Sequence, residues 1–286
     1  MSLKLFQPII DESEKILIDK LSPKIDKTVV KLLIKKIAEH TENGRVNFDI
    51  NDLAILENEI YEEIKGSGYN EYINSYIKLY NALDDIIIEE QVKTNALKAN
   101  SIRSLWNNSN AKNIIIDKVI YDLGSAGMKD VFVKGLANIM RDINYTNMPS
   151  KQAISLLESK IETNSYTQKY IRNTVFDSLN QYDGAFNNEI REAYDFKNFI
   201  YVGNTIENSR AICLHLRNTL NGRFSEDVLK QVLNEYCPNG KPSNDIIEID
   251  NKKYRKGGGM IEGTTFENFQ QQRGGWGCRH RCLATK

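Results

Sequence analysis

Thiol and imidazole side chains gather in the last quarter of the chain. Cys213 stands two residues before His215, and Cys278, His280 and Cys282 alternate in a second group near residue 280. Thiolate and imidazole are the ligands of structural zinc, which takes four of them in a tetrahedron. We therefore treat Cys213, Cys278, His280 and Cys282 as candidate ligands of a structural zinc ion, with His215 as a substitute.

The spacing within each group leaves other interpretations open. One intervening residue is tighter than the usual zinc-knuckle spacing, and suits a metal only where alternate side chains of a strand share a face. Cys213 and Cys278 can instead pack together as small apolar residues, or form a disulfide, with His280 bonded to a backbone carbonyl. A thiol hydrolase would use Cys213 with His215 or His280. No oxyanion-hole pattern accompanies that pair, so we do not expect an enzyme.

The same end of the chain is basic, although the whole chain has a net charge of zero. Residues 252–286 hold eight Lys and Arg against two Glu. Contacts to nucleic-acid phosphates need positive charge and no base reading. The candidates for non-specific contacts to DNA are Lys252, Lys253, Arg255, Lys256, Arg273, Arg279 and Arg281. The alternative is a solvated surface, or a face that docks on an acidic partner.

Helical periodicity fills the chain up to about residue 195. Apolar residues recur every three or four positions, and the longest unbroken patterns run from about 69 to 98 and from about 165 to 194. Met148-Pro149-Ser150 marks a boundary between them. We expect a mainly α protein in three parts: a long-helix N-terminal body over 1–148, a helical connector over 149–196, and a small α+β module over 197–286.

The pattern changes after residue 196. Residues 198–202 predict a short strand, residues 226–236 a helix capped by Ser225, and residues 245–255 a β-hairpin around Asp250-Asn251. The first 20 residues lack an uninterrupted apolar region, so no signal peptide is expected. No segment is apolar enough to span a membrane. The thiols are therefore expected in a reducing compartment, where disulfides are rare.

Six short segments in a fixed order carry a family resemblance. They are Asp177–Asp183, Phe199–Gly203, Ser209–Cys213, Asn221–Ser225, Glu262–Asn268 and Arg273–His280. This succession resembles the minor head proteins of tailed bacteriophages, in the Mu F-like, head morphogenesis group. An aromatic-Val-Gly strand end leads there to Arg-x-x-Cys, and Gly-Gly-aromatic-x-Cys-Arg-His closes the domain. Here Arg281-Cys282 follows, where the group often has apolar or aromatic residues.

The resemblance implies a role in assembly rather than in catalysis. The partners would be the phage portal or the major capsid protein, with non-specific contact to packaged DNA, and no membrane. The location would be the host cytoplasm during assembly and then the virion head. Within the module, we expect six residues to act as structural elements: Arg210, Cys213, Gly275, Trp276, Cys278 and His280. The alternative is a phage-borne effector enzyme, a Cys/His hydrolase or toxin carried with the particle.

Overall fold

The structure is a computed structural model, and it describes residues 6–123, 129, 133–164, 166–275, 278 and 280–286. Its helical elements are α1 (Gln7–Glu14), the π-helix η2 (Lys15–Leu21), α2 (Ser22–Glu39), α3 (Ile50–Gly66), α4 (Tyr69–Asn95), α5 (Ala99–Asn107), α6 (Asn110–Leu123), α8 (Lys134–Tyr145), α9 (Ser150–Asn164), α10 (Tyr166–Tyr194), α11 (Ala211–Leu214), the π-helix η4 (His215–Thr219), α12 (Glu226–Tyr236), the 3₁₀ turn η5 (Pro238–Gly240) and α13 (Phe269–Gln272). The strands are β1 (Thr41–Glu42), β2 (Arg45–Val46), β3 (Asn198–Val202), β4 (Arg223–Ser225), β5 (Ile246–Ile249), β6 (Lys252–Arg255) and β7 (Arg281–Thr285).

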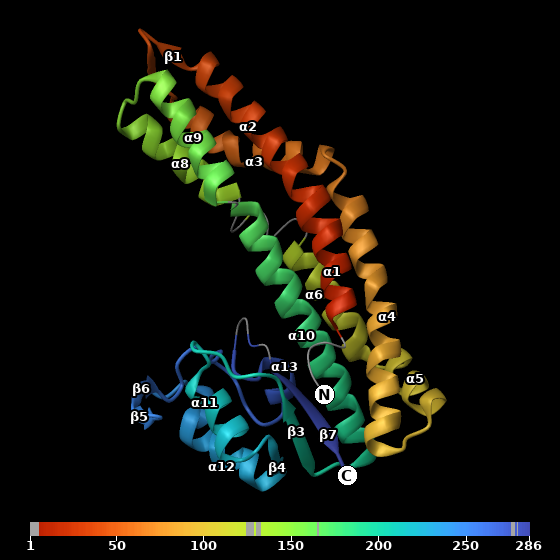
Figure 1. Cartoon of the computed structure of the whole chain (residues 1–286). Coiled ribbons are helices and arrows are strands. Elements are labelled where there is room, and N and C mark those ends of the chain that lie inside the picture. The colour runs from red at the N-terminus through yellow and green to blue at the C-terminus, as the bar shows by residue number, and fades with distance from the viewer. Residues whose placement is uncertain (1–5, 124–128, 130–132, 165, 276–277, 279) are drawn as a thin grey trace. The chain divides into compact units, whose positions relative to one another are not determined.

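The expected fold class is confirmed: the chain is mainly α, with a small α+β module after residue 197 (Figure 1). The predicted strand 198–202 is β3, and the predicted hairpin is the antiparallel pair β5 and β6. Helix α12 begins at the predicted cap, where the Ser225 hydroxyl accepts a hydrogen bond from the Val228 amide. Among the described residues, no helix is long and apolar enough to cross a bilayer.

The chain forms two compact units. Unit 1 comprises residues 1–10, 80–116 and 176–286, and unit 2 comprises residues 11–79 and 117–175. These units are not the three sequential parts expected from the sequence, because the two long helices α4 and α10 each contribute to both. The C-terminal module therefore shares its compact unit with the second half of α4 and of α10, and with α5.

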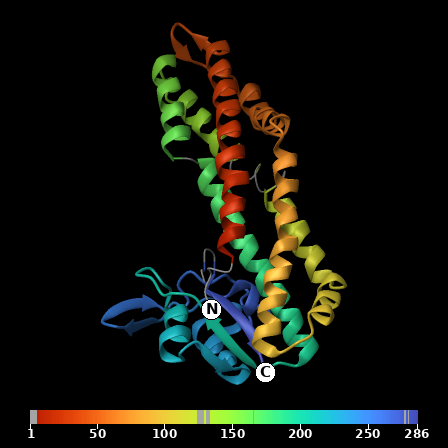
Figure 2. The same ribbon diagram turned by 45° about the vertical axis from the view of Figure 1, so that its right-hand side comes forward.

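Unit 2 is a helical bundle that buries one face of each helix. Helix α2 places Ile25, Val29, Leu33 and Ile37 at four-residue spacing, and all four are fully buried. The helix contacts α3 and α9, and α2 and α9 run side by side in both views (Figures 1 and 2). Helix α3 begins with a capping box in which Asp49 accepts hydrogen bonds from the Asn51 and Asp52 amides.

The module of unit 1 is organised on a three-stranded antiparallel sheet in the order β4-β3-β7. In its register Tyr201 of β3 lies opposite Cys282 of β7, and Val202 lies opposite Arg281. Alternate residues of a strand point to opposite faces. Tyr201 and Cys282 therefore face a core shared with α11 and α12, whereas Arg281 points to the side occupied by α4 and α10.

Candidate metal centre

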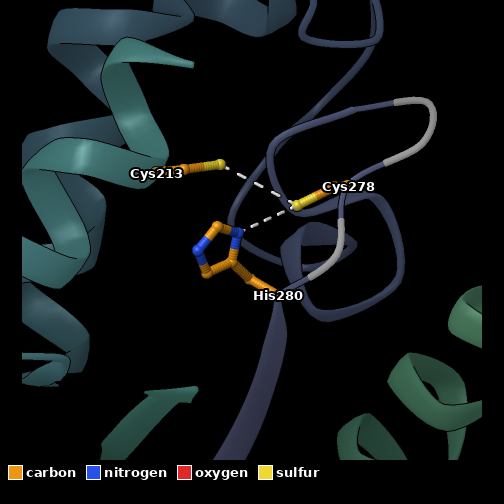
Figure 3. A group of neighbouring side chains, drawn as sticks. All are labelled: Cys213, Cys278 and His280. Atoms are coloured by element: carbon orange, nitrogen blue, oxygen red, sulfur yellow. Dashed lines mark hydrogen bonds between the residues drawn. The ribbon is translucent and has the colours of Figure 1, made fainter. Parts of the chain in front are cut away.

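Cys213, Cys278 and His280 converge at one point of the module (Figure 3). The two sulfur atoms lie 3.8 Å apart, and the Nδ1 atom of His280 lies 3.8 Å from the Cys278 sulfur. The three potential ligand atoms all lie within 4.8 Å of one another. The predicted contact between Cys213 and Cys278 is confirmed, and both cysteines are free thiols in the structure.

Each ligand reaches this point from a different kind of element. Cys213 belongs to the short helix α11, which begins after Arg210, whose backbone is extended. Cys278 lies in the turn that follows α13, where its amide bonds the Gly275 carbonyl, and His280 directly precedes β7. Because β7 pairs with β3 along its whole length, the sheet holds the second group of ligands against the first.

Glycines make room for the cluster. A Cβ atom on Gly274 would overlap the Cys213 sulfur and come within 3.2 Å of the Cys278 sulfur. A Cβ atom on Gly203, at a φ of +138°, would lie 2.7 Å from Cδ2 of His280. Any side chain at either position would displace a ligand, so these glycines of the resembling segments belong to the geometry of the cluster.

A second loop, around Gly259, packs against the segments that carry Arg210 and Gly275. A Cβ atom on Gly259 would overlap the Arg210 guanidinium group, and one on Gly275 would overlap the Gly259 carbonyl oxygen. The loop around Gly259 therefore lies in close contact with both segments. Trp276, the sixth residue with an expected structural role, lies outside the described residues.

The Tyr201 side chain lies directly beside the cluster. Its hydroxyl lies 3.5 Å from the Cys213 sulfur and 3.6 Å from the Cys278 sulfur. Its ring stacks on the His280 imidazole, with the centroids 5.0 Å apart and the planes 8° from parallel. A single tyrosine thus orients the imidazole and offers one hydroxyl proton to the two sulfurs.

The cluster is almost closed to solvent. Cys213 is 2% exposed, Cys278 5% and His280 4%. The hydrogen bond with Cys278 and the burial of the thiol raise the pKa of Cys213. The same hydrogen bond, with further contributions from His280 and Arg273, lowers the pKa of Cys278.

A small cavity of about 120 Å³ adjoins the three side chains. Cys213, Cys278 and His280 all line it, together with Asn204, Ile206, Asn208, Ser209 and Arg210. Its wall thus combines sulfur and imidazole ligands with amide, hydroxyl and guanidinium groups. Among the described residues, the Nε2 atom of His280 is buried without a hydrogen-bond partner.

Two of the candidate ligands do not join the cluster. Cys282 is buried in the core that the sheet shares with α12. Two residues along a strand place it about 6.7 Å beyond His280, so its sulfur does not join the cluster. His215 is only half-buried, and its ring lies 5.4 Å from that of Tyr236. Cys213 and His215 lie in helical backbone, at the junction of α11 and η4, rather than on a strand. Two positions along a helix correspond to more than half a turn, so their side chains point in different directions.

The expectation that Arg281 contacts DNA is wrong, because its guanidinium group is fully buried and paired within unit 1. It donates to both oxygens of Asp183 on α10, at 2.7 and 3.0 Å, and to both oxygens of Glu90 on α4, at 2.6 and 3.0 Å. Its guanidinium carbon also lies 4.1 Å from the centre of the Phe6 ring. Arg281 therefore fastens β7 to two helices.

Arg273 is likewise buried, which contradicts its predicted contact with DNA. It donates to the backbone carbonyls of Asn180 and His280, and to the Asn180 side-chain oxygen at 3.2 Å. The Asn180 amide in turn donates to the Cys278 carbonyl at 3.2 Å. Arg273 and Asn180 thus tie the loop that carries two candidate ligands to α10.

The remaining basic candidates differ in accessibility. Lys252, Lys253 and Arg255 are exposed on the hairpin strand β6, and Lys256 pairs with Glu235 at 2.5 Å. Arg279 lies outside the described residues. Among the basic candidates that the structure describes, those with accessible charge lie on the hairpin, and their contact with DNA stays a prediction.

The residues that dock the module on α4 and α10 were missed in the sequence, although one signal was present. Gln91 follows the apolar spacing of α4 and is fully buried. Its amide donates to the Asn187 oxygen at 2.7 Å, and Asn95 donates to the Ala284 carbonyl of β7 at 3.0 Å. A polar residue on the apolar face of a long helix is the mark of a buried hydrogen-bond partner.

Comparisons with known proteins add no relative. A scan against protein-family models and searches of curated proteins and of solved structures found no match to this chain. The interpretation of the cluster therefore depends on its geometry and on the resemblance carried by the six segments.

Proposed function

We propose that this chain is an assembly protein of a tailed-phage head, a minor capsid or head morphogenesis protein associated with the portal. The observation that carries the proposal is the convergence of the resembling segments. Gly203, Cys213, Gly274 and Cys278 come from three of those segments and meet around His280. Residues that merely matched by chance would have no reason to meet in one small core.

The form of that core supports a structural role for it. The sulfur atoms, the imidazole and the two arginines Arg273 and Arg281 are buried, and the arginines bind groups of α4 and α10. The resembling segment 177–183 contributes Asn180 and Asp183 to this docking. Thiol, imidazole and guanidinium groups that hold segments of the chain together are typical of a structural protein, as expected for a component of a larger particle.

The test is co-purification during head assembly. The chain is co-expressed with the portal and major capsid proteins of the phage genome that would carry its gene, with an affinity tag on the portal. We expect the chain to elute with the portal and to sediment with the assembled heads. Heads that assemble without the chain, or a chain that stays in the unbound fraction while heads form, would overturn the proposal.

The exposed charge of the hairpin can be tested in the same particles. Lys252→Glu/Lys253→Glu reverses the charge of β6 without touching the buried arginines. If the hairpin contacts packaged DNA, the variant heads incorporate the chain normally but lose chemical cross-linking between the chain and DNA. Unchanged cross-linking would show that the hairpin lysines do not make the contact with DNA.

A second candidate, a Cys/His hydrolase, is favoured by one observation. The pKa of Cys278 is lowered, and its sulfur lies 3.8 Å from the Nδ1 atom of His280 beside a cavity, an arrangement that would favour a thiolate in a hydrolase. Such a thiolate would react with iodoacetamide in the folded protein at mildly acidic pH. Alkylation of Cys278 only after denaturation would exclude it as a nucleophile and favour the structural role.

A further inference from the structure

We propose that Cys213, Cys278 and His280 bind one zinc ion through their two sulfur atoms and Nδ1, with the fourth coordination position on the side of the 120 Å³ cavity. This inference goes beyond the proposed function, because the metal content of the isolated chain does not depend on whether the chain enters a phage head.

Two separations of the ligand atoms match those around a tetrahedral ion. With Zn–S bonds of about 2.3 Å, two thiolates at the tetrahedral angle lie about 3.8 Å apart. The sulfur atoms of Cys213 and Cys278 are 3.8 Å apart. With a Zn–N bond of about 2.05 Å, sulfur and nitrogen should lie about 3.6 Å apart. Cys278 and His280 are 3.8 Å apart.

The charges of the site also suit a divalent cation. Two sulfur atoms and an imidazole gather in a core that is at most 5% exposed, and Arg210 lines the cavity beside them. A zinc ion with two thiolates and a neutral imidazole forms a group of zero net charge, which costs less to bury than a lone thiolate. Zinc binds thiolates and displaces the protons of the thiols, so the affinity of the site rises with pH.

The surroundings of the three side chains resemble an outer shell of a metal site. The Tyr201 hydroxyl lies within 3.6 Å of both sulfurs and can donate a hydrogen bond to a zinc-bound thiolate. The Tyr201 ring fixes the plane of the imidazole, so that Nδ1 points to Cys278 (Figure 3). Gly274 keeps the space beside the sulfurs free of a side chain.

A site with three protein ligands leaves one position for a ligand from solution. The cavity borders all three ligands and is large enough for a few water molecules. Ser209 and Asn208 line it and offer hydrogen-bonding groups to a zinc-bound water. The same opening is the entry path for the ion.

The first test measures metal in the intact chain. Protein purified without chelators or added metal is assayed for zinc by mass spectrometry, and apoprotein is titrated with Co²⁺. We expect one equivalent of zinc per chain. We also expect the sulfur-to-cobalt charge-transfer band and the intense visible bands of a tetrahedral cobalt–thiolate site. Full-length protein with no stoichiometric zinc and no such bands would overturn the proposal.

Variants assign the ligands. Cys213→Ser, Cys278→Ser and His280→Phe each remove one ligand atom, and the phenyl ring keeps the stacking on Tyr201. We expect each to weaken zinc binding by more than about 100-fold, since changes to outer-shell partners alone cost 10–100-fold. Tyr201→Phe should weaken it by about 10–100-fold. Cys237→Ala and Cys282→Ala are matched controls, because both thiols are buried in the same unit but lie outside the cluster.

The controls separate a metal site from its competitors. If Cys237→Ala or Cys282→Ala loses zinc as fully as Cys213→Ser, the assigned ligand set is wrong. If a ligand variant does not fold, removal of zinc from the wild-type chain by a chelator, followed by recovery of the cobalt spectrum, still tests the site. Mass spectrometry that finds a Cys213–Cys278 disulfide in the purified chain would also overturn the proposal.

Discussion

Replacement of Arg281 by methionine tests whether the buried arginine holds the module to its helices. Methionine has a similar length and can still pack on Phe6, but it carries no charge and no donor. The change leaves the carboxylates of Glu90 and Asp183 buried without their cation, since both side chains are about 1% exposed. Their four hydrogen bonds to the guanidinium group are lost at the same time.

The expected loss is large on the scale of protein stability. Removing one partner of a buried ion pair costs about 3–5 kcal/mol, because the other charge remains desolvated and unpaired. Domains are commonly stable by only about 5–15 kcal/mol. Arg281→Met should therefore remove about a fifth or more of the free energy of unfolding of unit 1.

The assay is urea denaturation at neutral pH, followed by circular dichroism and by tryptophan fluorescence, to which Trp106 of unit 1 contributes. Arg103→Met is the matched control, because Arg103 pairs with Asp85 at 2.6 Å but both side chains are about half exposed. Such surface pairs contribute about 0–1 kcal/mol. A further variant, Arg281→Met/Glu90→Gln/Asp183→Asn, removes all the charges and should recover most of the loss.

Two outcomes would refute this reasoning. If Arg281→Met unfolds within about 1 kcal/mol of the wild type, as Arg103→Met is expected to do, the buried pairs do not hold the unit together. If the triple variant is no more stable than Arg281→Met alone, the loss does not come from unpaired carboxylates.

Two further predictions concern the same unit. Gly184→Ala on α10 should destabilise the fold by about 2 kcal/mol or more, because the new Cβ would overlap the Gln270 backbone. The control is Gly66→Ala in α3, where the new Cβ meets open space. This control should be neutral or stabilising by up to about 1 kcal/mol in the same denaturation assay. Burial raises the pKa of Glu90, and the opposing effect of Arg281 is smaller. The protonated form of Glu90 therefore contributes stability that is complete below its unfolded pKa of about 4.3. This contribution is lost as the pH rises through the pKa of Glu90 in the folded protein. Glu90→Gln should remove this decline, and a wild type that instead gains stability relative to Glu90→Gln over that rise in pH would contradict the sign.

The sequence was sufficient for elements that depend on neighbouring residues. The strand 198–202 and the capped helix 226–236 follow from local patterns and appear as β3 and α12. The meeting of Cys213 with Cys278, 65 residues apart, was predicted from the residue types, as shared metal ligands or as thiols packed together. These features could be predicted because periodicity, capping residues and ligand residue types are recognisable in short segments of the sequence.

The burial of Arg273 and Arg281 could not be predicted in this way. Arg273 and Arg281 belong to a basic stretch, and charge counting places such residues on the surface. Their partners Asn180, Asp183 and Glu90 lie between 93 and 191 positions away. Burial of a charge depends on those distant partners, and a sequence pattern does not reveal them. For the same reason the compact units do not follow the order of the chain.

The position of β7 has a consequence for the synthesis of the chain. Glu90 and Arg281 are separated by 191 positions, so α4 and α10 leave the ribosome long before the strand that carries their arginine. Until residues 281–285 emerge, the two carboxylates keep their water and one edge of β3 has no partner strand. A ribosome that stalls before residue 281 would therefore hold a nascent chain with an open edge strand, available for pairing with a neighbouring nascent chain.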